Sequence, residues 1–443
     1  YEKEYFFATG TGFNVGLSVD AELNGGQMIS NGGNLIYIDG EGTVSQGVEY
    51  KDEDTGKDDF YWRYGTFGFS SDVFGKEYEN AATASIYNET DYVCSNGVVY
   101  GCITLDEGFA QNTILAYYDN EKGWKKLSNM PKEKEGLNGV ILASYNGELY
   151  LMGGTDEDDN FSKTVMKYST ASKKWYSAKS LPEGRAYSKA IQVGKKIVVT
   201  LGSNGTMNVP ANLIYDGTKW TKSKATIGKS IDTQIIEGKN KKFAVLMGEI
   251  GLVKGGIIYT NLRVDSLGDT FTYNIAKDKF IASKYALNAS NLEFDNLYAT
   301  TAGDKLYVVY GFAMADDEGK EFGSNKSKLS NKDFYDEDDY EDDAKILCIP
   351  IDSGAVYVED TSEFGAYVEG TGYYLPGDTV TLKAAVMDKK VNISQFMVNG
   401  KSVKKGKTGY VYTARAYDLP AKITASVKAC LLYTSPSPRD RQK

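Results

Sequence analysis

The chain has 443 residues, of which 41% are hydrophobic and 13% aromatic, and this composition supports a buried core rather than a disordered chain. Its formal net charge of −10 at pH 7 argues against a nucleic-acid partner, because phosphate binding requires a basic surface. No apolar stretch approaches the roughly 20 residues that cross a bilayer, so we expect no membrane insertion. The 34 tyrosines and 47 glycines, with only 8 prolines, favour β-strands joined by tight turns.

The first predicted elements are six repeated units, and the three in the middle of the chain are the most regular. Each opens with a glycine-containing turn and continues as a strand with a tyrosine. A later strand ends in tyrosine and is followed five to seven residues on by an aromatic residue. Trp124 and Trp175 are 51 residues apart, and Trp175 and Trp220 are 45 apart. The regular units cover 96–124, 146–175 and 194–220, and the degenerate ones begin near residues 33, 243 and 303.

A unit of roughly 45–50 residues with four short strands is one blade of a β-propeller. The pair Gly153-Gly154 lets the chain leave its strand tightly, without a clash at Cβ. The tyrosine and tryptophan fill the wedge between neighbouring sheets. One blade cannot bury both of its faces, so the blades must stack around an axis and close. We therefore predict an all-β fold with six blades, or seven as the alternative.

Two cysteines lie in the second unit. The Asn96-Gly97 pair predicts a two-residue hairpin turn that would pair Cys94 with Val99. Cys102 lies three residues further along its strand, about 10 Å away, which is beyond disulfide reach. We therefore expect Cys94 and Cys102 to be packed or free thiols.

The double glycine, the tyrosine and the later tryptophan resemble the kelch repeat over roughly residues 30–357. The outer units depart from that pattern, because the double glycine or the tryptophan is missing. The resemblance implies a kelch-type β-propeller over residues 1–357. In the kelch arrangement, the loops after the double-glycine strand lie on the same face as the connections between blades.

The period ends near residue 357, and a different pattern follows. Segment 367–384 gives a Pro-Gly turn and an alternating strand, and two further strand patterns cover 396–401 and 423–427. This order resembles the small β-repeat modules of bacterial cell-surface proteins, which are usually spacers or adhesion units. The resemblance implies a small β-module over residues 358–429 and an extracellular or cell-surface location.

Residues 430–443 do not fit the sequence that precedes them. They resemble translated sequencing-adapter read-through, so we expect a non-native tail that includes Cys430. The alternative is a genuine disordered basic tail.

The chain contains no histidine, which excludes several kinds of chemistry. Ser-His-Asp and Cys-His catalysis, histidine-bearing zinc sites and the copper centre of some kelch-type enzymes all require that residue. A mechanism that uses carboxylates alone is compatible with the sequence. We expect a non-catalytic binding or adhesion protein with a glycan or protein ligand. The alternatives are an extracellular carbohydrate-active enzyme that uses carboxylates and a surface spacer without a ligand.

Two candidate ligand-binding residues follow from the kelch resemblance. Segment 181–185 contains the Pro-x-x-Arg that often begins an inner kelch strand, and it ends at Arg185. The resemblance implies that Arg185 and Tyr187 point into the central funnel, where such proteins bind their ligands. The alternative for Arg185 is an ion pair with a carboxylate of a neighbouring blade.

An acidic loop follows the double glycine and supplies the other candidates. Asp156, Asp158 and Asn160 are oxygen donors at alternate positions, a spacing that could bind Ca²⁺. Phe161 stands where the EF-hand loop needs glycine, so the alternative is a solvated charged loop. We expect no other cofactor.

Overall fold

The computed structural model shows a protein built almost entirely of β-strands. Its described residues contain no α-helix, and the two 3-10 turns are η4 (Lys132–Lys134) and η6 (Ala416–Asp418). Within this part of the chain, no helix is long and apolar enough to span a membrane. The structure describes residues 11–18, 27–30, 34–38, 42–51, 53–54, 56, 58–64, 91–106, 111–227, 234–238, 241–246, 248–253, 256–264, 267–282, 294–303, 305–312, 343–350, 356–362, 366–374, 378–386, 391–420 and 422–431.

Six four-stranded antiparallel sheets contain most of the described strands between residues 11 and 350. Sheet 1 contains β2 (Gln27–Ser30), β3 (Leu35–Ile38), β4 (Val44–Lys51) and β5 (Asp58–Tyr64), and sheet 2 contains β6 (Asp91–Ser95), β7 (Val98–Asp106), β8 (Gln111–Asp119) and β9 (Gly123–Asn129). Sheet 3 contains β10 (Ile141–Tyr145), β11 (Glu148–Met152), β12 (Val165–Ser169) and β13 (Lys174–Ser177), and sheet 4 contains β14 (Lys189–Val193), β15 (Lys196–Thr200), β16 (Leu213–Tyr215) and β17 (Trp220–Lys222). Sheet 5 contains β20 (Glu249–Val253), β21 (Gly256–Val264), β22 (Leu267–Asn274) and β23 (Lys279–Ala282), and sheet 6 contains β24 (Phe294–Ala302), β25 (Lys305–Phe312), β26 (Asp343–Pro350) and β1 (Thr11–Ser18).

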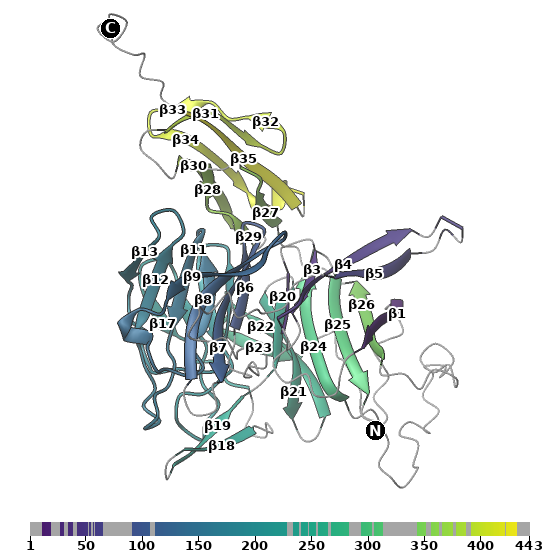
Figure 1. Ribbon diagram of the computed structural model, residues 1–443, viewed down its shortest axis with the longest axis vertical. Coiled ribbons are helices and arrows are strands. Elements are labelled where there is room, and N and C mark those ends of the chain that lie inside the picture. The colour runs from purple at the N-terminus through teal and green to yellow at the C-terminus, as the bar shows by residue number, and fades with distance from the viewer. Residues whose placement is uncertain are drawn as a thin grey trace, which may run out of the picture.

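The six sheets are arranged radially, with the first strand of each at the centre. Residues from β2, β6, β10, β14, β20 and β24 line a single axial channel. The strand nearest the N-terminus closes the arrangement, because β1 pairs with β26 and completes sheet 6 (Figure 1). The predicted all-β propeller architecture is therefore confirmed.

The hairpin turns form where the sequence places residues that tolerate a positive φ. Asn96 and Gly97 have φ of 50° and 77°, and Asn146 and Gly147 have 51° and 77°. Two consecutive positive φ values suit the two-residue turns that match strand twist. Cys94 pairs with Val99 in register, as the sequence predicts.

The two cysteines of sheet 2 are both free thiols, as expected. Burial raises the pKa of Cys94 to about 12 and raises the pKa of Cys102 further, so both thiols stay protonated.

The tryptophans of the repeat join neighbouring sheets. Each ring contacts the tyrosine of its own unit, with ring centroids 5.0–5.5 Å apart. Each indole N–H also donates a hydrogen bond to the preceding sheet, or to the connection that follows that sheet. The same kind of contact between neighbouring sheets thus occurs three times. These bonds run from Trp124 to Gly42 O (2.6 Å), from Trp175 to Ser128 Oγ (2.9 Å) and from Trp220 to Lys179 O (2.9 Å).

The fourth unit differs from the sequence prediction. Segment 243–248 was predicted to be its glycine-bounded strand, but Phe243 lies in a separate hairpin of β18 (Gln234–Gly238) and β19 (Lys241–Val245). The corresponding strand of sheet 5 is β21, and its double glycine, Gly255-Gly256, comes at the start of the strand rather than after it. The hairpin packs on the loops of sheets 3 and 4, where Phe243 meets Phe161 with ring centroids 5.0 Å apart.

The remaining strands form a separate β-sandwich, which we call the module. The break between the propeller sheets and the module falls between Pro350 and Val356. The last strand extends to Leu431 and includes Cys430, while residues 432–443 of the expected tail lie outside the described residues. One sheet has the order β29 (Gly372–Tyr374), β27 (Val356–Asp360), β35 (Lys422–Leu431), β31 (Val391–Val398) and β32 (Lys401–Ser402), and the other has β28 (Ala366–Glu369), β30 (Thr379–Val386), β34 (Gly409–Arg415) and β33 (Lys405–Gly406).

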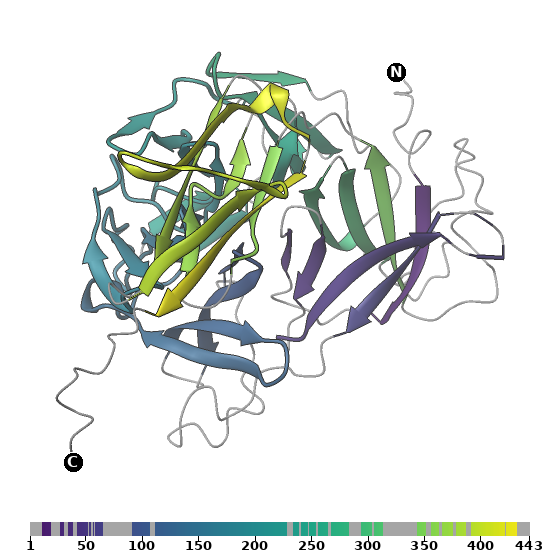
Figure 2. The ribbon, with the colours of Figure 1, turned by 90° about the horizontal axis from the view of Figure 1, so that it is seen from above.

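The module stands on one end of the propeller (Figure 1) and lies over the sheets drawn in blue and teal (Figure 2). Its Thr371 hydroxyl donates to Asn96 Oδ1 at 3.1 Å, and Gln192 Nε2 donates to Thr371 O at 3.3 Å. Asn96 belongs to a turn that ends an innermost strand, and Gln192 lies near the end of another. We call this end of the propeller the module face.

The opposite end is the loop face. Strand β10 runs toward the module face and β11 returns, so Gly153 and the acidic loop lie at the far end from the module. The connection that carries Arg185 lies there too, because the Gly154 N–H donates to Arg185 O at 2.8 Å.

Candidate functional site

The propeller contains an axial channel whose volume is about 150 Å³. It runs along the innermost strands from the loop face to Thr371 of the module. Three charged side chains line it, each the first residue of an innermost strand: Asp91 of β6, Lys189 of β14 and Glu249 of β20. Gln27 occupies the equivalent position of β2. The loop-face end of the channel is therefore a polar ring, defined here as Gln27, Asp91, Lys189 and Glu249.

The Asp91 carboxylate accepts hydrogen bonds from residues of three sheets at this ring. One carboxylate oxygen accepts from Gln27 Nε2 at 3.2 Å and from Tyr92 N at 3.0 Å. The other accepts from Leu142 N of β10 at 2.9 Å. Burial raises the pKa of Asp91 above its usual value, while Lys189 and these hydrogen bonds oppose that shift. Both oxygens of this carboxylate already have protein partners, so Asp91 holds the wall of the channel in place.

Lys189 and Glu249 bridge sheets 4 and 5 across the same ring. The Lys189 Nζ to Glu249 Oε2 distance is 3.8 Å, and both side chains are largely but not fully buried. Burial raises the pKa of Glu249, the charge of Lys189 lowers it, and the nearby Asp91 raises it again. At this separation the two groups attract each other without a short hydrogen bond. The pair can therefore turn its remaining donors and acceptors toward a ligand.

Polar contacts gather at the module-face end of the channel. Thr371 reaches the channel from the module and contacts Asn96 and Gln192 as described above. Ser144 donates to Ser95 Oγ at 2.8 Å and joins sheets 3 and 2 at this end.

Arg185 does not line the channel, although it was the leading sequence candidate. Its side chain is 0% exposed, its Nη2 donates to Glu183 Oε1 at 2.6 Å, and its Nη1 donates to Leu201 O at 3.3 Å. Ala211 O is a further acceptor. The partner carboxylate belongs to the same connection, two residues earlier, rather than to a neighbouring sheet. Arg185 thus holds the connection between sheets 3 and 4.

Tyr187 is not among the residues that line the channel either. It stands two residues before Lys189, at the loop face, with a φ of 57°. Its ring covers Gly139, where an added Cβ would lie 2.6 Å from Tyr187 Cδ1. Its amide donates to Gly139 O at 2.9 Å, which fixes the segment that leads into β14.

Asp156, Asp158 and Asn160 form a self-contained turn on the loop face. The Asp156 carboxylate accepts from Asp158 N at 3.0 Å, from Asn160 N at 2.8 Å and from Asn160 Nδ2 at 3.0 Å. The bonds from Asn160 hold the pKa of Asp156 below its usual value. Among the described residues, no three His, Cys, Asp or Glu side chains form a group that could hold a metal ion. The structure brings this turn beside Arg185 through the backbone, since Arg185 N donates to Ser162 O at 3.2 Å.

A buried lysine also supports the loop face. Lys134 is 0% exposed, and its Nζ donates to Gly153 O and to Thr164 O, each at 2.6 Å. Burial lowers the pKa of Lys134 to about 7. Its ammonium group therefore ties η4 to the double-glycine bend of sheet 3.

Lys134→Met is expected to alter how stability depends on pH. In the unfolded chain this lysine holds its proton up to about pH 10.5, whereas the folded protein releases it near pH 7. Between these values the unfolded state binds more protons, so the unfolding free energy of the wild type should rise with pH. The rise relative to Lys134→Met is at most about 1.4 kcal/mol per pH unit. Urea unfolding from pH 7 to pH 10 measures it.

The exposed Lys132→Met, in the same turn, is the matched control and should track the wild type at each pH. A constant difference between wild type and Lys134→Met over this range would contradict the lowered pKa.

The sequence did not single out the polar ring. Its residues precede ordinary strand patterns and belong to no motif. The available signal was positional, because Asp91 and Lys189 each stand five residues before the turn at Asn96 or Gly194. Superposing the units on their turns would have placed these charges at one level of the propeller.

Comparison with known proteins agrees with the repeat. Residues 142–182 match the family model of the Kelch motif, from β10 through the double glycine to Pro182. Together with the four-stranded antiparallel sheets, this match defines the fold as a kelch-type β-propeller. The solved structure titled "Structure of YjhT" is 13% identical, with a TM-score of 0.45, and the match covers 66% of this chain and 96% of that chain. No curated protein matches this chain.

Proposed function

We propose that this chain is a non-catalytic binding protein with a six-bladed propeller that recognises a glycan or a protein through its loop face. The polar ring of the axial channel carries the proposal. Propellers host many unrelated activities, so the fold supports a binding role only in general terms, and the site has to supply the function.

The size and chemistry of the channel favour recognition of a small polar group. A volume of about 150 Å³ is below the 300–1,000 Å³ typical of sites for drug-sized ligands. It suits one sugar residue or one side chain that enters from the loop face. Lys189 offers donors, Glu249 offers acceptors and Gln27 offers both, which matches a hydroxyl-bearing or zwitterionic group.

A carbohydrate-active enzyme that uses carboxylates is the second candidate. The raised pKa values of Asp91 and Glu249 in one channel favour it, since a general acid needs a raised pKa. Two observations favour binding instead. Both oxygens of Asp91 accept hydrogen bonds from the protein, and the channel has little room for a substrate with a water.

We propose an extracellular or cell-surface location and a bacterial origin. Support comes from the resemblance of the module to small β-repeats of bacterial cell-surface proteins. The module contacts the propeller at the module face, which is opposite the loop face. It can therefore hold the loop face away from a cell. The proposal includes no nucleic-acid partner and no insertion into a membrane.

Glu249→Gln is expected to weaken ligand binding at least about tenfold, because it removes the charge opposite Lys189 while keeping the side-chain shape. The measurement is a screen of the full chain against immobilised glycans and peptides, followed by titration of each hit. Lys277→Met, an exposed lysine on the outer turn of sheet 5, is the control and should bind as the wild type does.

Thermal unfolding of each variant separates loss of binding from loss of fold. If a hit binds Glu249→Gln with unchanged affinity, the channel is not its site. Release of sugar from a bound glycan by the wild type, abolished in Glu249→Gln, would establish the enzyme instead. A screen without any hit would support a spacer that has no ligand.

A further inference from the structure

The module carries a second surface, far from its contact with the propeller. Segment 389–407 contains six lysines and no acidic residue, in a protein whose net charge is −10. Four of these lysines belong to the described residues and are all exposed: Lys401, Lys404, Lys405 and Lys407. We call them the basic tip. They lie on the hairpins around β32 and β33, at the end of the module that points away from the propeller (Figure 1).

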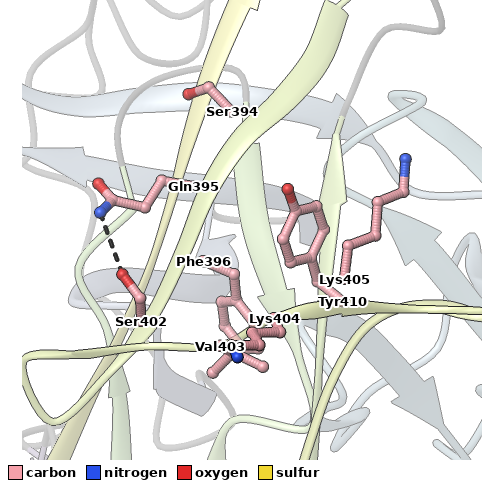
Figure 3. Close-up of a pocket in the computed structure, with 8 residues that line it drawn as sticks. All are labelled: Ser394, Gln395, Phe396, Ser402, Val403, Lys404, Lys405 and Tyr410. Atoms are coloured by element: carbon pink, nitrogen blue, oxygen red, sulfur yellow. Dashed lines mark hydrogen bonds between the residues drawn. The ribbon is translucent and has the colours of Figure 1, made fainter.

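A groove of about 490 Å³ opens beside the basic tip. It forms where the chain crosses from β32 of one sheet to β33 of the other, which leaves the edge of the sandwich open there. Phe396 is fully buried at the groove, and Tyr410, Lys404 and Lys405 line it. Figure 3 shows Tyr410 beside Lys405, and Gln395 donating to Ser402 Oγ at 3.3 Å.

The side chains of the groove combine three kinds of contact. Tyr410 offers part of an aromatic ring, with Lys405 Nζ 6.0 Å from the ring centroid. Gln395 and Ser402 offer amide and hydroxyl groups. Lys404 and Lys405 offer positive charge, and no ion pair within the described residues occupies either of them. This combination fits a sugar that carries negative charge. The aromatic ring can pack on the sugar ring, the polar groups can hydrogen-bond its hydroxyls, and the lysines can pair with its charge.

We propose that this groove and the basic tip bind an anionic polysaccharide, one whose sugar units bear carboxylates. A linear polyanion suits the surface because its repeated charges can meet several lysines while one sugar unit occupies the groove. Counterions released from the chain then contribute to the affinity. This site is independent of the axial channel, which lies in the other domain.

An anionic membrane and an acidic protein are weaker fits. A membrane surface is flat and gains most from exposed apolar side chains, whereas this groove is hollow and Phe396 at its base is buried. An acidic protein, including the propeller of a second copy, would meet the lysines but would leave the polar groove unfilled.

The test measures binding of the full chain to immobilised polygalacturonate, with uncharged dextran as the reference surface. Binding is expected to polygalacturonate alone, and to weaken steeply between 50 mM and 200 mM salt. Lys404→Gln/Lys405→Gln should lower the affinity about tenfold and reduce the salt dependence. Lys173→Gln/Lys174→Gln, which removes two adjacent exposed lysines from the propeller, is matched in charge and should bind as the wild type does.

Tyr410→Leu distinguishes a sugar site from a general attraction between charges. It should weaken binding to polygalacturonate and leave the salt dependence unchanged. The Glu249→Gln variant of the channel should bind polygalacturonate normally, which separates this proposal from the one above.

Several outcomes would overturn the proposal. These are the absence of binding to polygalacturonate, equal binding to dextran, and equal loss of affinity in the two double variants. Tighter binding to vesicles of anionic phospholipid than to polygalacturonate would identify a membrane surface. Salt-sensitive dimers that disappear in Lys404→Gln/Lys405→Gln would identify a second copy of the chain.

Discussion

Gly153→Ala is expected to destabilise the protein by at least about 3 kcal/mol, because two separate costs meet at this residue. Gly153 has a φ of 63°, which strains any residue with a Cβ. An added Cβ would also lie 1.9 Å from Arg185 O. That oxygen cannot move away freely, since Gly154 N donates to it at 2.8 Å. The substitution must therefore break the junction between the double-glycine loop and the connection to sheet 4.

Gly147→Ala is the matched control for this effect. Gly147 has a φ of 77°, but the nearest atom to an added Cβ is Asn96 Nδ2 at 3.7 Å. This variant carries the conformational cost alone, about 1 kcal/mol. Urea unfolding followed by tryptophan fluorescence compares the two. An equal loss in both variants would show that the close approach to Arg185 is not the cause.

The sequence predicted the repeat well because the signals of the repeat are local. Double glycines, Asn-Gly turns and the tyrosine-tryptophan spacing act over a few residues, so their consequences can be derived locally. Tyr168 and Trp175 face each other in register across β12 and β13. The tryptophan then reaches Ser128 of the preceding sheet. A local pattern thus encodes a contact that recurs between neighbouring sheets.

The fourth unit shows where local pattern misleads. The run 243–248 imitates a repeat strand because it is apolar and ends in glycine, yet it belongs to the β18–β19 hairpin. The true strand contains Ile257, Ile258 and Tyr259, which are all fully buried. A strand buried on both faces has no alternation to mark it, so periodicity alone could not distinguish the two.

The candidate site was harder to predict than the fold. Arg185 was selected because it ends a recognisable motif, and its motif turned out to serve the junction between sheets. Asp91, Lys189 and Glu249 are separated by more than fifty residues from one another, and each has an ordinary strand beside it. Only the radial arrangement of the sheets brings the three to one channel, and no sequence window contains that information.

Arg185→Met is expected to destabilise the protein by about 3 kcal/mol. Removing one partner of a buried ion pair typically costs about 3–5 kcal/mol, since the other charge is left without compensation. Glu183 keeps Lys222 as a partner, so the loss should fall at the lower end of that range. Burial alone would raise the pKa of Glu183, but the hydrogen bonds from Lys222 and Arg185 hold it below its usual value. Leu201 O keeps a bond from Ser188 Oγ at 3.0 Å, whereas Ala211 O loses its guanidinium donor.

Lys222→Met is the control, because Lys222 is the exposed partner of the same carboxylate and its removal should cost less than about 1 kcal/mol. Binding is then measured below the unfolding temperature of each variant. If Arg185 is a structural residue, Arg185→Met should keep the affinity of the wild type for any ligand of the loop face. A variant of unchanged stability that no longer binds that ligand would return Arg185 to the role that its motif implied, with its guanidinium turned toward the ligand.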